Sequence, residues 1–188
     1  WPPATAVPDL RTLATRFGPV AVVVLAIAVR LHNVAVFPGL RAPDGFGHFT
    51  YIWHMAETWR VPLATSGWSF FHPPLYYAFM AAVWHLLADF DPIARLQVGT
   101  ALVSLLGLLH AAVSLYFIRR RFPGEKLLQL VVPSLLLFLP VQLYSAGYLG
   151  NEALSAVLCS ASLLALLRLL EKPSDSRAAL LGLGFGLG

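Results

Sequence analysis

Four ionisable residues, Asp44, His48, His72 and Glu152, are of types that could carry acid–base chemistry. They lie in or beside polar, aromatic stretches that interrupt long apolar runs. His48 follows Asp44 by four residues, so on a helix the two side chains would share one side, one turn apart. A carboxyl group at a membrane boundary loses water on one flank, which raises its pKa and suits it to accept a proton. The pattern indicates a proton-transfer site at one membrane face.

Each of these residues also has a simpler interpretation. Asp44 could cap the helix that follows it, and a single histidine such as His48 is more often an interfacial side chain than a ligand. His72 could join an acid in a metal site, although no HxxxH or HExxH motif is present. Glu152, or Asn151 beside it, could cap the amino end of the next helix. Their expected location on one side of a membrane favours the functional interpretation.

The composition predicts an all-α, polytopic membrane protein. Hydrophobic residues make up 58% of the chain and charged residues 12%, and the mean hydropathy is +0.72. The apolar residues form long runs rather than alternating. The isoelectric point near 9.6 could suit nucleic acid, but the basic residues form short clusters between apolar runs, so we expect membrane lipids and no nucleic acid as partners.

The apolar runs predict how the chain crosses the membrane. A helix rises about 1.5 Å per residue, so about 20 residues cross roughly 30 Å of hydrocarbon. We expect a cytoplasmic tail over 1–16 and the amino-terminal part of a longer transmembrane domain over 17–188. Within that domain, the sequence predicts an external loop over 37–92 and spans at about 17–36, 93–118, 127–148 and 153–170, with a truncated span over 178–188.

Residues 73–88 are apolar but short, and they begin with two prolines. If this segment crossed the membrane, the basic cluster at 119–121 would lie outside. If it lies along the surface as an amphipathic helix, the strong basic clusters all fall inside, and Asp44 and Glu152 fall outside. The positive-inside rule therefore favours a surface helix.

The external loop is expected to contain a further helix over 46–59. Its spacing gives it two faces. One is an apolar stripe of Phe49, Ile52, Trp53 and Ala56, and the other can combine Asp44, His48 and Tyr51. Two interpretations remain for Arg30, near the outer end of the first span. Its guanidinium could extend to the interface, or it could face an internal cavity and help hold a phosphate.

The ordered motifs resemble those of a known family. After a first span with an arginine near its end come PDGFGHFTYI, FFHPPLYY, a long span ending in IRRRF, and a third span ending in YSAGYLGNEAL. Together they resemble the amino-terminal module of the GT-C membrane glycosyltransferases. Within that family, they resemble the bacterial relatives of the protein O-mannosyltransferases and of the lipid A aminoarabinose transferase. The resemblance covers about residues 17–175, and the predicted surface helix resembles the family's juxtamembrane helix.

The resemblance implies that the full-length protein is a glycosyltransferase of the cell envelope. It would move a sugar from a polyprenyl-phosphate-linked donor to a lipid or protein acceptor at the external, periplasmic face of the inner (cytoplasmic) membrane. Asp44 matches the family's catalytic carboxylate, and His48 would orient or tune it. Family members often have Asp-Glu at this place, whereas this chain has Asp44-Gly45.

The donor would be bound by Arg30, His72, Tyr76 and Glu152. His72 matches a position that often helps to hold metal or phosphate, so a divalent metal ion at His72 is the cofactor that the resemblance implies. The alternative function is a membrane transporter or channel module, in which charges buried in the membrane form a pathway. The spans carry few charges and the polar residues gather in a loop, which favours the transferase.

Overall fold

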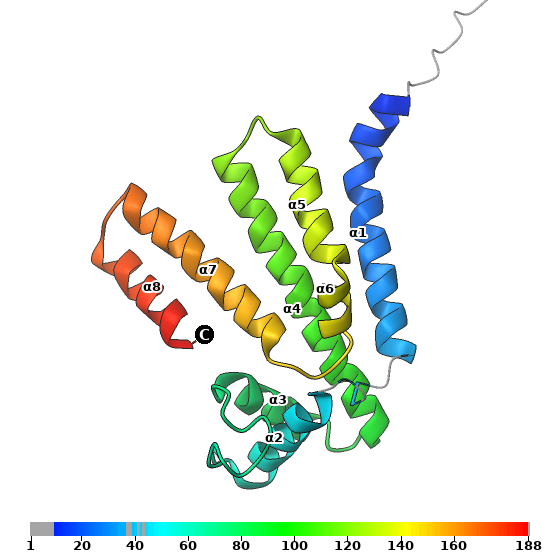
Figure 1. Ribbon diagram of the computed structural model, residues 1–188, viewed down its shortest axis with the longest axis vertical. Coiled ribbons are helices and arrows are strands. Elements are labelled where there is room, and N and C mark those ends of the chain that lie inside the picture. Colours follow the sequence, from blue (N-terminus) through cyan, green and yellow to red (C-terminus); the bar gives the residue numbers. More distant parts are fainter. Residues whose placement is uncertain (1–9, 37–38, 41, 43, 188) are drawn as a thin grey trace, which may run out of the picture.

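The structure is a computed structural model that describes residues 10–36, 39–40, 42 and 44–187, with the side chains of 10–16 left out. The predicted tail over 1–16 therefore lies mostly outside the described residues. The regular structure of the described residues is helical throughout, without strands (Figure 1). In chain order the helices are α1 (Leu10–Val36), α2 (Gly45–Thr58), α3 (Leu75–Leu86), α4 (Pro92–Arg121), α5 (Lys126–Phe138), α6 (Pro140–Ser145), α7 (Glu152–Glu171) and α8 (Asp175–Leu187).

Among the described residues, three helices are long and apolar enough to cross a membrane. They are the Phe17–Val36 part of α1, the whole of α4, and α7. Large apolar side chains along them point outward, among them Val24, Leu105 and Leu163. Such a surface is costly in water but suits hydrocarbon, and a helix satisfies its own backbone polar groups there. The all-α class is confirmed, and the three helices are compatible with a membrane protein.

The single helix predicted over 127–148 is instead two helices, α5 and α6. They meet at Leu139, whose backbone is extended with φ −55° and ψ 131°. The cause is Pro140, because a proline ring disfavours the helical conformation of the residue before it. Pro140 then occupies the first position of α6, where its missing N–H group costs nothing.

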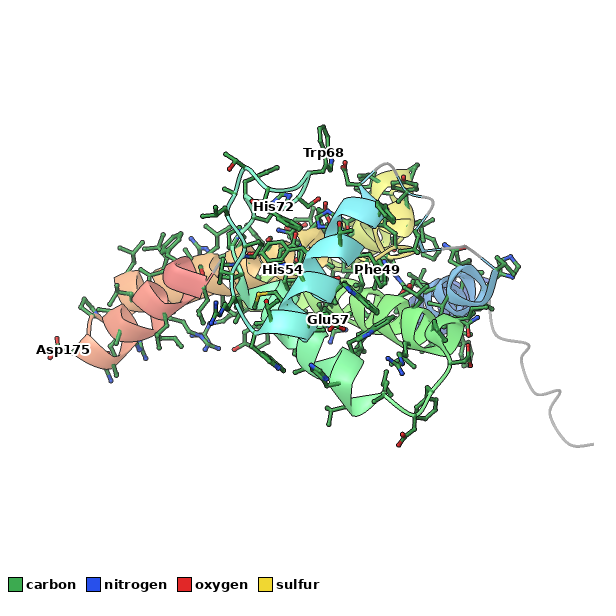
Figure 2. The ribbon with its side chains drawn as sticks, turned by 90° about the horizontal axis from the view of Figure 1, so that it is seen from below. Phe49, His54, Glu57, Trp68, His72 and Asp175 are labelled. Carbon is green, nitrogen blue, oxygen red and sulfur yellow. The ribbon has the colours of Figure 1, made fainter. Side chains whose placement is uncertain are left out.

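Helices α2 and α3 pack against each other and lie across one end of the long helices (Figures 1 and 2). With 12 residues, α3 is about 18 Å long, well short of the roughly 30 Å that a crossing needs. A helix therefore forms within residues 73–88 as predicted, and its length suits a surface helix. Its position relative to a membrane stays a prediction.

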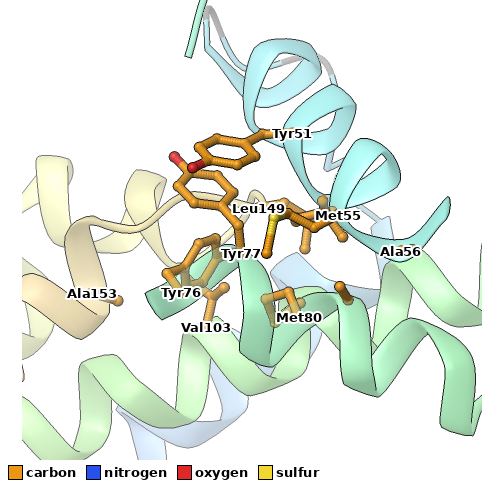
Figure 3. Close-up of a cluster of buried hydrophobic side chains, with 11 residues drawn as sticks. Tyr51, Met55, Ala56, Tyr76, Tyr77, Met80, Val103, Leu149 and Ala153 are labelled. Carbon is orange, nitrogen blue, oxygen red and sulfur yellow. The ribbon is translucent and has the colours of Figure 1, made fainter. Parts of the chain in front are cut away.

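A buried core joins the α2–α3 pair to the long helices (Figure 3). Tyr51 of α2 stacks on Tyr77 of α3 with ring centroids 3.7 Å apart, and Met80 of α3, Val103 of α4 and Leu149 before α7 belong to the same cluster. The burial of these side chains is the main free-energy gain available to hold α2 and α3 on the bundle.

A glycine lets this core form. A Cβ atom at Gly99 of α4 would lie 2.8 Å from Leu149 Cδ2 and 3.0 Å from Met80 Cε, both closer than carbon atoms normally approach. The absence of a side chain at Gly99 therefore allows Leu149 and Met80 to pack directly on the α4 backbone.

The buried face of α2 differs from the apolar stripe that the spacing predicted. The buried side chains include His48, Tyr51 and Met55, whereas Trp53 of the predicted stripe is 47% exposed. His48 and Tyr51, from the face expected to be polar, thus point inward. Ile52 and Ala56, from the predicted apolar stripe, are buried with them. The stacking of Tyr51 on Tyr77, and a hydrogen bond made by His48, give this polar face partners inside the protein.

Truncating Met80 tests this core. Met80 is 4% exposed, so Met80→Ala should leave a cavity and lower the free energy of unfolding by about 2–5 kcal/mol. The measurement is thermal or denaturant unfolding in detergent, with tryptophan fluorescence as the signal. Leu86→Ala, at the end of the same helix where the side chain is 83% exposed, should change stability by less than about 0.5 kcal/mol. Equal losses in the two variants would contradict the packing described here.

Candidate functional site

His48 connects three segments that are far apart in the sequence. Its side chain, 1% exposed, lies near the amino end of α2. The Nδ1 atom is 2.7 Å from the hydroxyl of Tyr77 on α3, and the Nε2 atom is 3.7 Å from Oε1 of Glu152 at the start of α7. Both ring nitrogens of this buried imidazole thus face polar partners, as burial of a polar ring requires.

The hydroxyl of Tyr77 stays protonated beside His48. Burial, and next the negative charge of Glu152, raise the pKa of Tyr77 far above its ordinary value, so the phenol is a hydrogen-bond donor available to Nδ1. When Tyr77 donates to Nδ1, a neutral His48 carries its own proton on Nε2, on the side of the Glu152 carboxylate. Tyr77, His48 and Glu152 thus form a row of three polar side chains.

Glu152 does more than cap α7. The side chain of Asn151, at the N-cap position, makes no capping hydrogen bond, and the Glu152 carboxylate hydrogen-bonds Tyr148 as well as facing His48. Burial, followed by the Glu152 charge, raises the pKa of Tyr148, so Tyr148 also remains a donor. The Glu152 side chain is 45% exposed, which leaves part of its carboxylate open to solvent or to a ligand.

His72 lies on the loop between α2 and α3 (Figure 2), and it is close to His48. Its ring stacks on that of His48, with centroids 5.3 Å apart and an angle of 26° between the ring planes. The pKa of His72 is lowered, first by burial and then by the nearby His48, while Glu152 and Asp44 act in the opposite direction. His72 is therefore an uncharged imidazole at neutral pH, able to gain a proton if an anion approaches.

Asp44 occupies the N-cap position of α2, but its side chain makes no capping hydrogen bond. Instead Oδ1 accepts a 2.8 Å hydrogen bond from the indole Nε1 of Trp68, on the α2–α3 loop. The expected pairing with His48 is limited to the backbone, where the His48 N–H group donates to the Asp44 carbonyl at 3.0 Å. The carboxylate is thus held by the loop rather than by the histidine.

The approach of Trp68 to α2 depends on Gly47. A Cβ atom at Gly47 would lie 2.6 Å from Ser69 Oγ and 2.8 Å from Trp68 Cδ1. No larger residue fits there without moving the loop, so the glycine allows Trp68 to reach Asp44. The signal was present in the sequence, because glycines at 45 and 47 in a first helical turn indicate a close backbone approach.

Arg30 lies apart from this group, whereas the ring of Tyr76 packs edge-on against Tyr77, with ring centroids 5.2 Å apart. Arg30 and Tyr76 are each 2% exposed. The guanidinium of Arg30 rests on Gly107 of α4, and its three nitrogens have no hydrogen-bond partner among the described residues. The hydroxyl of Tyr76 lacks a partner in the same part of the structure, and burial raises its pKa. Arg30 therefore does not extend to an interface, and both side chains belong to the protein interior in this conformation.

The described residues do not form a ready metal site. Among them, no group of three or more His, Cys, Asp or Glu side chains is placed to hold an ion. The rings of His48 and His72 are stacked face to face, whereas ligating nitrogens must point their in-plane lone pairs at one centre. The divalent ion expected at His72 stays a prediction.

Sequence reasoning missed the roles of Tyr77, Tyr148 and Trp68. None of the three carries a local sequence pattern that points to hydrogen bonding. The chain matches no family model, and comparisons with curated proteins and with solved structures find no match. The motifs and this geometry are therefore the features from which a function can be inferred.

The protonation of His72 gives a test of the site. Because its folded pKa lies below the ordinary 6.5, the unfolded chain binds this proton more readily. The His72 contribution to stability is then present above about pH 6.5 and is lost as the pH falls through the folded pKa. Titration of ¹³C-labelled histidine by NMR, with His72→Gln for assignment, should place the His72 midpoint below 6.5.

A second variant checks the cause of this shift. The charge of Glu152 favours protonated His72, so Glu152→Gln should lower the His72 midpoint further. Glu57→Gln, on the exposed side of α2, should leave it unchanged. A midpoint at or above 6.5, or a rise in Glu152→Gln, would be incompatible with the site described.

Proposed function

We propose that this chain contributes the catalytic carboxylate of a GT-C-type membrane glycosyltransferase. The enzyme would transfer a sugar from a polyprenyl-phosphate-linked donor to a lipid or protein acceptor at the external face of the cytoplasmic membrane. One observation carries the proposal: His48, His72 and Glu152, from three distant segments, converge at the end of the long helices where Asp44 is held by Trp68.

In the proposed reaction Asp44 is the general base. Its carboxylate takes the proton from the acceptor hydroxyl or amine while the acceptor oxygen or nitrogen bonds to the anomeric carbon. The bond between that carbon and the phosphate oxygen breaks, and polyprenyl phosphate leaves with the electron pair. The hydrogen bond from Trp68 to Oδ1 fixes the orientation of the carboxylate, so that Oδ2 can face the acceptor.

His72 is proposed to meet the leaving phosphate. Its imidazole is neutral when the site is empty, because burial lowers its pKa. A phosphate beside it would favour the imidazolium form, so donor binding would be coupled to proton uptake and would place positive charge where the leaving group develops negative charge.

His48, Tyr77 and Glu152 have a positioning role in this proposal. The hydrogen bond between His48 and Tyr77 and the 3.7 Å contact between His48 and Glu152 hold the ring on which His72 stacks. The exposed part of Glu152 is available to a sugar hydroxyl. Arg30 and Tyr76 could act as substrate ligands only after a rearrangement that exposes them, since both are buried. No step is assigned to them or to a metal ion.

Replacing Asp44 tests the proposal directly. Asp44→Asn keeps an acceptor for the Trp68 hydrogen bond but removes the base, so sugar transfer by the full-length protein should fall by about 10²–10⁴-fold. The assay would use membranes and a panel of radiolabelled polyprenyl-phosphate sugars. Asp89→Asn, in the exposed turn after α3, is the control with the same chemical change. Near-normal transfer by Asp44→Asn, at equal protein level, would remove Asp44 from the mechanism.

Arg30 favours the second candidate, a transporter or channel module. A permanently charged guanidinium inside a candidate span, without a hydrogen-bond partner in the described part of the chain, is typical of an ion pathway. This alternative predicts an anion-selective conductance across planar bilayers that contain the chain, abolished by Arg30→Gln and retained in Arg60→Gln. Bilayers that stay non-conducting would contradict it, while leaving the transferase proposal intact.

A further inference from the structure

A second charged feature lies at the end of the bundle away from His48. Here α4, α7 and α8 enclose a cavity of about 280 Å³. Arginines from all three helices line it, Arg120 from α4, Arg168 from α7 and Arg177 from α8, and the rest of the lining is apolar. Three guanidinium groups from separate helices converge on this cavity, which makes it suited to bind an anion.

The positive charge of this cavity is only partly neutralised. Glu171 is the one carboxylate in the described residues that pairs with any of the three arginines, through a 3.2 Å contact with Arg120 Nη2. Arg168 and Arg177 have no acidic partner there, so the cavity keeps a net positive charge. Guanidinium groups do not lose their proton in proteins, so the charge cannot be relieved by titration.

Neutral contacts hold the two remaining arginines in place. Nη2 of Arg168 donates a 2.7 Å hydrogen bond to the Tyr116 hydroxyl, and its guanidinium carbon lies 5.5 Å from the centre of the Tyr116 ring. Nη1 of Arg177 donates to the carbonyls of Arg168 and Lys172, at 2.6 and 3.0 Å. These bonds use few of the five N–H donors that each group carries. The rest are available on side chains that are already positioned, which reduces the entropy cost of binding.

Apolar surface beside the cavity indicates the kind of molecule that carries the anion. A groove of about 410 Å³ runs along α4 and α7, and its lining, including Phe117, Leu163 and Leu167, is almost wholly apolar. Phe117 precedes Arg120 by one helical turn, and Leu167 is next to Arg168. Both helices are long and apolar enough to cross a membrane. A charged head beside an apolar tail is the form of a lipid, and basic pockets between such helices suit anionic headgroups.

We propose that the cavity between α4, α7 and α8 binds the phosphate group of a net-anionic lipid, with an acyl chain in the groove beside Phe117. Arg168 and Arg177 bind the phosphate oxygens, while Arg120 stays partly neutralised by Glu171. The proposal does not depend on the glycosyltransferase reaction, because the cavity shares no residue with the site around His48.

Lipid binding by the purified chain tests this proposal. The chain, in detergent, is titrated with phosphatidylglycerol and, separately, with zwitterionic phosphatidylcholine, and bound lipid is counted by native mass spectrometry. We expect one phosphatidylglycerol to bind at least about tenfold more tightly, equivalent to about 1.4 kcal/mol. Arg168→Gln should remove that preference. Arg168→Lys should retain part of it, because it keeps the charge but loses the two-pronged geometry.

A matched control distinguishes binding at this cavity from general attraction of an anionic lipid to the basic end of the bundle. Arg121→Gln changes the same basic cluster by the same charge, next to Arg120 but outside the cavity lining, and should alter phosphatidylglycerol binding by less than about twofold. Equal losses in Arg121→Gln and Arg168→Gln would overturn the proposal. Thermal unfolding of each variant identifies those that fail to fold. If Arg168→Gln is one of them, Arg177→Gln replaces it.

Inorganic phosphate distinguishes the two sources of the anion. If a lipid is the ligand, millimolar phosphate should compete weakly with phosphatidylglycerol, because it cannot fill the apolar groove. Leu163→Asn, in that groove, should weaken the binding of phosphatidylglycerol but should leave the binding of inorganic phosphate to the cavity unchanged. Binding of free phosphate as tight as that of the lipid, or no preference for phosphatidylglycerol over phosphatidylcholine, would overturn the assignment to a lipid.

Discussion

The hydrogen bond between His48 and Tyr77 is the contact on which the arrangement of the site depends. A buried imidazole must satisfy both of its nitrogens, since an unsatisfied polar group in the interior costs about 1–3 kcal/mol. The Tyr77 hydroxyl forms a hydrogen bond with Nδ1, and Glu152 faces Nε2. Because these partners belong to α3 and α7, satisfying one ring fixes α2 relative to both. The stacking of His72 on the same ring then follows from that placement.

Arg30 shows the opposite situation in the same protein. Its guanidinium is buried beside Gly107, and no hydrogen-bond partner for it lies within the described residues. A charge held in this way is costly, and it is retained in proteins chiefly where it has a use. His48 has polar neighbours at both ring nitrogens, so its site is already assembled in this structure. Arg30 has none among the described residues, so its charge still requires an anion or a rearrangement.

The two ends of the long helices have different polar chemistry. At one end, imidazoles, phenols and partly exposed carboxylates gather around His48, a set suited to moving protons. At the other end, Arg168 and Arg177 present fixed positive charge held by neutral partners, a set suited to binding an anion without reacting with it. Apolar helices separate the two, so each keeps its own electrostatic environment.

The sequence by itself determined the helical class, three of the long apolar helices and the presence of short helices at about 46–59 and within 73–88, because hydropathy and spacing are local properties. Only the tertiary structure decided which side chains meet. The His48–Tyr77 bond joins residues 29 positions apart, and the Asp44–Trp68 bond joins residues 24 apart. No periodicity encodes such pairs. The inward face of α2, the burial of Arg30 and the use of Gly47 all depend on how separate helices pack, and packing is decided by contacts between segments distant in sequence.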